Sequence, residues 1–247
     1  MMVINYILSA LYIVYFFAFL FIFHPIQWVA LNVFGQKAHR NTVDLLNFFL
    51  LRGSHLVGSS IQYTPPKNLP KATPFIIVAN HQSMYDIIGI IWFYRKLNPI
   101  FVSKASLAKG IPSISYNLRN SKAALINRKD RKQALASITK LGKYIEENKY
   151  SAVIFPEGTR SRKGLRKFAT GGLEVLLKNA PSAHILPVAV NGTGRMDAYK
   201  VYPVNSFIKL SWTTLEAFNP ADMSVDEVAL KVRSMIQTEL TRQEAES

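Results

Sequence analysis

The chain has 247 residues, enough for one large domain or for one domain with a short appendage. It contains no cysteine, which excludes disulfides, thiolate metal sites and cysteine nucleophiles. The formal net charge of +15 points to an anionic partner: lipid headgroups, nucleic acid, or an acidic carrier or substrate.

The first 36 residues form an apolar segment without a charged side chain. Residues 3–23 would be about 30 Å long as a helix, roughly the thickness of a bilayer's hydrocarbon core. A secretory signal is a poor alternative, because no Lys or Arg precedes the segment and no small-residue cleavage site follows. We expect His24-Pro25 to interrupt the helix. Residues 1–36 are thus interpreted as two short membrane-anchoring helices, either a span plus an interfacial helix or a hairpin in one leaflet.

Basic residues are unevenly distributed over the rest of the chain. Lys37 and Arg40 lie just beyond the apolar segment, which favours a cytoplasmic location for everything that follows. Residues 87–129 hold eight Lys or Arg and residues 158–173 hold five, in both cases without an acidic residue. Beside a membrane anchor, anionic lipid is the simplest explanation of this charge, and solvated basic faces are the plain alternative.

Residues 37–247 are expected to form one α/β domain with a mostly parallel central sheet flanked by helices, because short apolar runs alternate with helical segments. A helix is expected over residues 36–58, a proline-punctuated loop over 63–70, and a buried strand over 75–79. Ser83 is expected to cap the next helix, and residues 243–247 to be frayed. Later strands are expected at 100–102, 123–126, 152–155, 185–190 and 207–212, and later helices at 105–109, 112–118, 130–147, 172–178 and 225–240.

The first candidate for chemistry is the turn after the strand at 75–79, Asn80-His81-Gln82-Ser83-Met84-Tyr85-Asp86. Asp86 can accept one ring N–H of His81, fix its tautomer and leave the other nitrogen to take a proton. No protein nucleophile accompanies the pair, so the histidine is expected to activate a substrate hydroxyl directly. Taken alone, this spacing also fits a His-Asp pair that only caps a helix.

The second candidate is the turn after the strand at 152–155, Phe155-Pro156-Glu157-Gly158-Thr159-Arg160-Ser161. Gly158 permits a tight turn or a close approach to a ligand, and Arg160 offers a planar fork for phosphate oxygens. Glu157 can position a substrate hydroxyl or orient an arginine, and Thr159 adds a hydroxyl donor. A surface turn with a solvated basic face is the alternative. Because both turns follow strands of a predicted parallel sheet, they can share one site.

Together the two turns resemble the first and third sequence blocks of the glycerolipid acyltransferases, and most of all those of the bacterial 1-acyl-sn-glycerol-3-phosphate (lysophosphatidic acid) acyltransferases. Residues 125–128 resemble the second block, although Lys122 stands where a glycine usually opens it. Residues 185–190 resemble the fourth block, and Lys104 resembles a basic position on the approach to the phosphate pocket. The resemblance covers residues 75–190.

This resemblance implies transfer of a fatty acyl group from acyl-CoA or acyl carrier protein to the sn-2 hydroxyl of 1-acyl-sn-glycerol 3-phosphate, giving phosphatidic acid. It implies no metal and no cofactor, and a place at the cytoplasmic face of the inner membrane. His81 would deprotonate the hydroxyl and Asp86 would orient the histidine. Main-chain N–H groups near Ser83 are candidates for stabilising the oxyanion. The implied substrate-binding residues are Lys104, Arg128 and Arg160 for the phosphate, and Glu157 with its neighbours Gly158 and Thr159 for the glycerol.

Two other interpretations stay open. A related acyltransferase would use another acceptor, such as glycerol 3-phosphate, a lyso-ornithine lipid or a lipid A precursor. A non-catalytic basic protein would bind anionic membranes or nucleic acid, but the aromatic residues lie in the anchor and the strands, and no nucleic-acid-binding module is recognisable, so we expect no nucleic-acid partner. The acyl donor, its chain length and the oligomeric state are left open.

Overall fold

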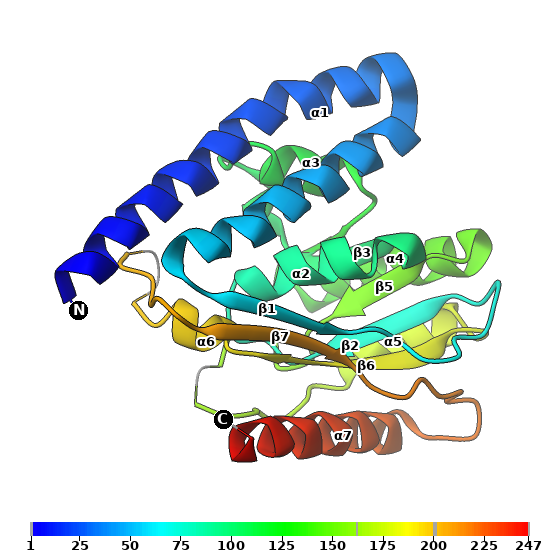
Figure 1. Ribbon diagram of the computed structural model, residues 1–247. Helices are drawn as coiled ribbons and strands as arrows, with labels where there is room; N and C mark the ends of the chain where they lie inside the picture. Colours follow the sequence, from blue (N-terminus) through cyan, green and yellow to red (C-terminus); the bar gives the residue numbers. More distant parts are fainter. Residues whose placement is uncertain (1, 162, 200–201, 247) are drawn as a thin grey trace.

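The computed structural model describes residues 2–161, 163–199 and 202–246. Its centre is a seven-stranded sheet with the strand order β1-β7-β6-β2-β5-β3-β4, and helices cover both faces (Figure 1). Neighbouring strands pair in parallel, except that β6 and β7 run antiparallel. The predicted α/β fold with a mostly parallel central sheet is therefore confirmed.

The strands predicted from residue 75 onward agree with the observed ones to within two residues. The strands are β1 Ser60–Thr64, β2 Phe75–Ala79, β3 Pro99–Lys104, β4 Ala124–Ile126, β5 Ser151–Ile154, β6 His184–Asn191 and β7 Lys209–Thr214. The helices are α1 Met2–Gly53, α2 Tyr85–Phe93, α3 Ile114–Asn120, α4 Arg131–Asn148, α5 Gly171–Asn179, α6 Thr193–Met196 and α7 Val225–Ala245. Short 3₁₀ helices span Ser54–Val57, Arg95–Leu97 and Ala105–Ala108.

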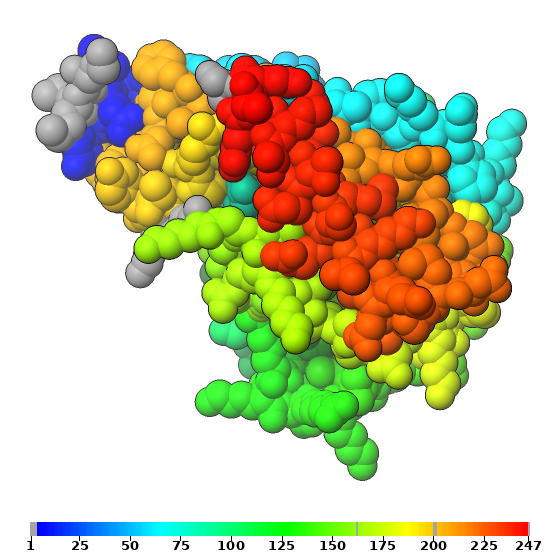
Figure 2. Space-filling model, turned by 90° about the horizontal axis from the view of Figure 1, so that it is seen from below, coloured from blue at the N-terminus to red at the C-terminus, as the bar shows by residue number. Residues whose placement is uncertain are grey.

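The sheet separates two hydrophobic cores. On one face, α1 and α2 pack against the strands through side chains such as Leu46 and Ile90. On the other face lie α4, α5 and α7, and Figure 2 shows α7 running across it. Strand β2 lies between β5 and β6, and all five of its side chains are buried because both faces of the sheet are covered. This rigid, central strand carries the turn with His81 at its carboxyl end.

Helix α1 is bent into two arms, residues 2–34 and 36–53, which pack side by side (Figure 1). The bend lies at Gly35, whose φ of 81° is a backbone conformation that glycine adopts without strain. Tyr15 Oη donates a hydrogen bond to the Phe49 carbonyl at 3.0 Å, which ties the arms together. The bend predicted at His24-Pro25 is therefore wrong. The helix continues through Pro25, and its one non-helical residue is Gly35.

Four further details differ from the sequence-based expectations. Residues 60–64, partly assigned to a loop, form the edge strand β1, which pairs in parallel with β7. Helix α2 begins at Tyr85 behind Met84, and the Ser83 hydroxyl accepts from the Tyr85 N–H at 2.9 Å without holding the capping position. The short helix α6 was not predicted. Residues 243–245 are not frayed, because α7 extends to Ala245 and Gln243 Oε1 accepts from Ser211 Oγ at 2.8 Å.

Candidate active site

Two turns that lie far apart in the sequence meet at one edge of the sheet. Strands β2 and β5 are parallel neighbours, so their carboxyl ends lie together. The turn after β2 contains His81, and the turn after β5 contains Ser161. The Ser161 N–H donates to the His81 carbonyl at 2.7 Å, so the two turns are bonded directly.

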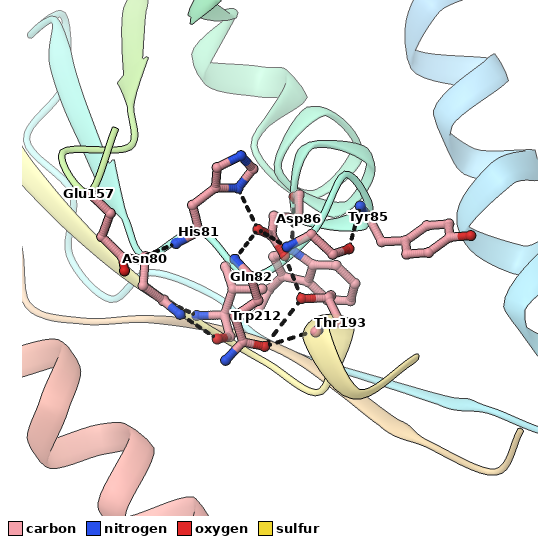
Figure 3. A network of polar contacts seen from close by, with 11 residues as sticks. Asn80, His81, Gln82, Tyr85, Asp86, Glu157, Thr193 and Trp212 are labelled. Atoms are coloured by element: carbon pink, nitrogen blue, oxygen red, sulfur yellow. Dashed lines mark hydrogen bonds and ion pairs between the residues drawn. The ribbon is translucent and has the colours of Figure 1, made fainter. Parts of the chain in front are cut away.

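The imidazole of His81 is held on both sides. Its Nδ1 lies 2.7 Å from Asp86 Oδ2 (Figure 3). Because a carboxylate only accepts, Nδ1 carries the proton and Nε2 is left with a free lone pair. The ring stacks on Phe155, with the two centroids 4.2 Å apart. The histidine side chain is 13% exposed, whereas that of Asp86 is fully buried. A substrate can therefore reach the imidazole, while the carboxylate bonded to it is shielded from solvent.

The buried Asp86 carboxylate is fixed by three further donors. The Gln82 and Ser83 N–H groups donate to Oδ2 at 2.7 and 3.0 Å, and Thr193 Oγ1 donates to Oδ1. A first-turn carboxylate reaches back to main-chain N–H groups in this way when a helix begins after a tight turn. The N–H groups expected near Ser83 for the oxyanion are therefore engaged by Asp86 at Gln82 and Ser83. Trp212 Nε1 donates to the Asp86 carbonyl at 3.1 Å and supports the same turn from β7.

Glu157 holds the two turns together. Its Oε1 accepts from the His81 N–H at 2.7 Å (Figure 3). Its Oε2 accepts from the Arg166 N–H at 3.0 Å. Burial raises the pKa of Glu157, while these two N–H groups act in the opposite direction. The carboxylate does not line the cleft in front of His81. Its placement thus differs from the predicted contact with the glycerol, because both of its oxygens are bonded to the main chain.

A cleft of about 790 Å³ lies in front of the imidazole. Its apolar wall comes from the sheet and from α4. The predicted residues Lys104, Arg128, Gly158, Thr159 and Arg160 all line it together with His81. The cleft also contains Arg131, the first residue of α4, which the sequence reasoning did not single out although it lies close to Arg128 in the chain. Cationic side chains beside an apolar wall suit a ligand with an anionic head and a hydrocarbon chain.

The chemistry of these side chains favours proton transfer. Among the residues that the structure describes, no three His, Asp or Glu side chains are grouped to hold a metal ion. The nearest carboxylates, Asp86 and Glu157, already accept from the imidazole and from main-chain N–H groups. The arrangement provides a base at Nε2, a carboxylate that stabilises the imidazolium, and cations that hold an anionic group in the same cleft.

The first arm of α1 has two different faces. Its inner face packs on the domain through buried residues such as Tyr12 and Leu20. Its outer face is apolar and exposed. In the described part of the chain, α1 is the one helix that is long and apolar enough to cross a membrane, judged by length and composition alone. The exposed apolar residues are Ile4, Tyr6, Ile7, Leu11, Val14, Phe17, Phe21, Ile22, Ile26, Trp28, Val29, Val33 and Phe34.

Known proteins are similar to this chain in sequence and in fold. Residues 60–191 match the family model described as Acyltransferase. The chain is 30% identical to the 1-acyl-sn-glycerol-3-phosphate acyltransferase of Borreliella burgdorferi over 77% of this chain and 80% of that one. It is 28% identical to the enzyme of that name from Haemophilus influenzae, over 56% of each chain. The crystal structure of the 1-acyl-sn-glycerophosphate (LPA) acyltransferase PlsC from Thermotoga maritima has the same fold, with a TM-score of 0.79, 23% identity and 98% coverage of both chains.

Proposed function

Because this chain belongs to the acyltransferase family, we propose that it transfers a fatty acyl group from a thioester to the sn-2 hydroxyl of 1-acyl-sn-glycerol 3-phosphate, forming phosphatidic acid. One observation carries the proposal: a histidine oriented by a buried carboxylate lines the same cleft as a group of cations and an apolar wall. The histidine accounts for activation of a hydroxyl, the cations account for a phosphate, and the apolar wall accounts for an acyl chain.

The reaction starts at the acceptor hydroxyl. His81 Nε2 removes its proton while the hydroxyl oxygen attacks the thioester carbonyl carbon and forms the new C–O bond. The Nδ1–H bond to Asp86 stabilises the imidazolium. The tetrahedral intermediate then collapses, the C–S bond breaks, and the imidazolium gives its proton to the departing thiolate. No covalent acyl-enzyme is needed, because the substrate supplies the nucleophile.

The phosphate of the acceptor is the group that the cations would bind. Arg160, Arg128 and Lys104 line the cleft from three different segments of the chain, and Arg131 adds a fourth positive charge. Binding through a phosphate that does not react orients the hydroxyl toward His81, and such positioning lowers the barrier. Gly158 and Thr159 lie in the same lining, next to Arg160, and would contact the glycerol.

The proposed location is the cytoplasmic face of the inner membrane. The inner side of the first arm packs on the domain, so this arm would lie along the bilayer surface with its outer face among the acyl chains. Lys37 and Arg40 follow the apolar arm, as expected for a domain on the cytoplasmic side. This position would bring the cleft close to a lipid acceptor. Acyl-CoA and acyl carrier protein are both suitable thioester donors.

The decisive experiment measures phosphatidic acid formed from 1-acyl-sn-glycerol 3-phosphate, with acyl-CoA and acyl carrier protein tested in parallel. His81→Ala and Asp86→Asn are expected to lower turnover by about 10²–10⁴, because the base or its orientation is lost. Circular dichroism and vesicle binding should stay unchanged in both variants. Near-normal turnover of His81→Ala would contradict the proposed mechanism.

The same assay separates the other interpretations. Glycerol 3-phosphate, a lyso-ornithine lipid and a lipid A precursor should each be tested with the donor that works. If one of them is acylated faster than 1-acyl-sn-glycerol 3-phosphate, the acceptor assignment is wrong. If none is acylated and the His81→Ala variant binds vesicles as the unmodified chain does, the protein is a non-catalytic membrane binder.

A further inference from the structure

A second basic cavity, of about 500 Å³, lies at the amino end of β3, whereas the cleft of His81 lies at its carboxyl end. We call it the elbow cavity, because its lining begins at Gln36, next to the bend of α1. Four cations from three separate segments line it, and Asp44 is the one acidic residue in its described lining. These cations are Lys37 and Arg40 from the second arm of α1, Arg95 after α2, and Lys122 after α3.

The two arginines of the elbow cavity are held in place by neutral groups. Arg40 donates to Asn98 Oδ1 and lies over the Tyr150 ring, 4.5 Å from its centroid. Arg95 donates to the Trp92 carbonyl at 2.7 Å and lies over the ring of the same residue at 3.9 Å. None of the ion pairs between described residues involves either arginine. Each guanidinium is therefore oriented in advance and keeps N–H donors for an anion, and both interact electrostatically with Asp44 in the same cavity.

Lys122 adds a cation to the elbow cavity from a backbone conformation that is typical of glycine. Its φ is 63°, in the left-handed region where a lysine is strained and a glycine is not. The fold alone would therefore be satisfied better by glycine at this position. The lysine places a cation in the lining of the elbow cavity, which glycine would not.

The lining of the elbow cavity begins directly after the bend that ends the first arm. Lys37 lies in its lining, and directly before the bend stand Val33 and Phe34, which are 64% and 70% exposed. A ligand with a phosphate in the cavity could therefore place hydrocarbon chains along the outer face of the arm. A lipid headgroup fits this neighbourhood better than a soluble anion does.

We propose that the elbow cavity binds a phosphate group, carried by the headgroup of a membrane lipid, at a site separate from the cleft of His81. Guanidinium groups match phosphate oxygens in geometry and charge, and four cations around one cavity exceed what the single Asp44 balances. The site requires no acyl transfer, so it is tested by binding alone. It goes beyond the proposed function and stands or falls separately from it.

The test uses the full chain carrying Arg160→Ala, which weakens phosphate binding in the cleft of His81. The first measurement is the binding of inorganic phosphate by calorimetry. The second measurement is co-sedimentation of the protein with phosphatidylcholine vesicles, with and without phosphatidate. Lys122→Gly should weaken binding roughly fivefold or more, because one cation near the phosphate is removed. Asp44→Asn should strengthen binding, since it removes the one carboxylate of the cavity.

The matched control is Lys96→Ala, which removes an equally charged, exposed lysine next to Arg95 that does not line the cavity. Glycine suits the backbone at 122, so Lys122→Gly should keep its melting temperature and its turnover with detergent-dispersed substrate. If Lys122→Gly weakens binding to phosphatidate vesicles and Lys96→Ala does not, the proposed lipid ligand is supported. If Lys122→Gly weakens binding of inorganic phosphate only, the ligand is a soluble phosphate and the proposed lipid ligand is wrong. If Lys122→Gly and Lys96→Ala weaken binding equally in both measurements, the cavity is only part of a diffuse basic surface and the proposal is overturned.

Discussion

At the residue scale, the geometry of the proposed catalytic site depends on Asp86 more than on any other side chain. Its carboxylate joins the imidazole of His81, two N–H groups of its own turn and the hydroxyl of Thr193. Each hydrogen bond restricts the rotation of the carboxylate. The imidazole is thereby fixed in one tautomer, with Nε2 available to the cleft. Small changes around Asp86 should therefore alter catalysis without changing any group that touches the substrate.

Thr193 is the clearest case of such a positioning residue. It is fully buried on α6, and its hydroxyl donates to Asp86 Oδ1. We expect Thr193→Val to lower kcat roughly tenfold, since one hydrogen bond to a charged group is lost, while KM for the acceptor stays close to its original value. Thr193→Ser should restore kcat, because the hydroxyl returns. If the valine variant lost only thermal stability and kept kcat, Thr193 would serve the fold alone.

Glu157 leads to a second prediction at this scale. Its two oxygens accept main-chain N–H groups of His81 and Arg166, so Glu157→Gln would set an amide NH₂ against one of these donors. We expect kcat to fall roughly tenfold or more because the turn of His81 loosens. The KM for the acceptor should change little, since Glu157 does not line the cleft. A large rise in KM with unchanged kcat would instead support direct contact with the glycerol.

The two arms of α1 show at the element scale how one helix serves two environments. The inner face of the first arm is buried against the second arm and α2, and Tyr12 contacts Tyr85 with ring centroids 6.0 Å apart. The outer face keeps large apolar side chains in contact with solvent. A soluble domain rarely exposes such a continuous apolar surface, which supports contact with a membrane.

Charges on the outer face test this contact. Val14→Asp combined with Phe21→Asp should lower partitioning into phosphatidylcholine vesicles by roughly tenfold or more per side chain, because each loses about 1.5–3 kcal/mol of burial in lipid. Folding should be unaffected, because both side chains are exposed. Leu230→Asp on α7 is the matched control, since Leu230 is equally apolar and 69% exposed but lies away from the arm. Unchanged vesicle binding of the double variant would exclude the arm as the anchor.

The strand order determines at the scale of the whole molecule which turns can cooperate. With β2 between β5 and β6, the turns after these three strands lie at one edge of the sheet. They provide His81, Glu157 and Thr193 respectively. The neighbouring strands β3 and β4 add Lys104 and Arg128 at the same edge. Four of these five segments line the cleft, and the fifth supports it through the hydrogen bond of Thr193 to Asp86. The basic residues of the lining are Lys104, Arg128, Arg131 and Arg160.

The sequence by itself determined the features that depend on neighbouring residues. Apolar runs and polar turns located the central strands along the chain, and the spacing of His81 and Asp86 indicated that the two side chains can approach each other, because both lie on one short turn. The same reasoning identified Lys104, Arg128, Gly158, Thr159 and Arg160 as residues for one site, and all of them line the cleft of His81.

Only the tertiary structure decided the features that depend on distant contacts. Residues 60–64 form the strand β1 because they pair with β7. Helix α1 bends at Gly35, where glycine adopts a positive φ without strain, and Pro25 remains helical. The contacts of Glu157 with His81 and of Thr193 with Asp86 join residues 76 and 107 positions apart. Periodicity and spacing describe only local conformation, so the partners of a side chain become known only once the sheet has brought distant turns together.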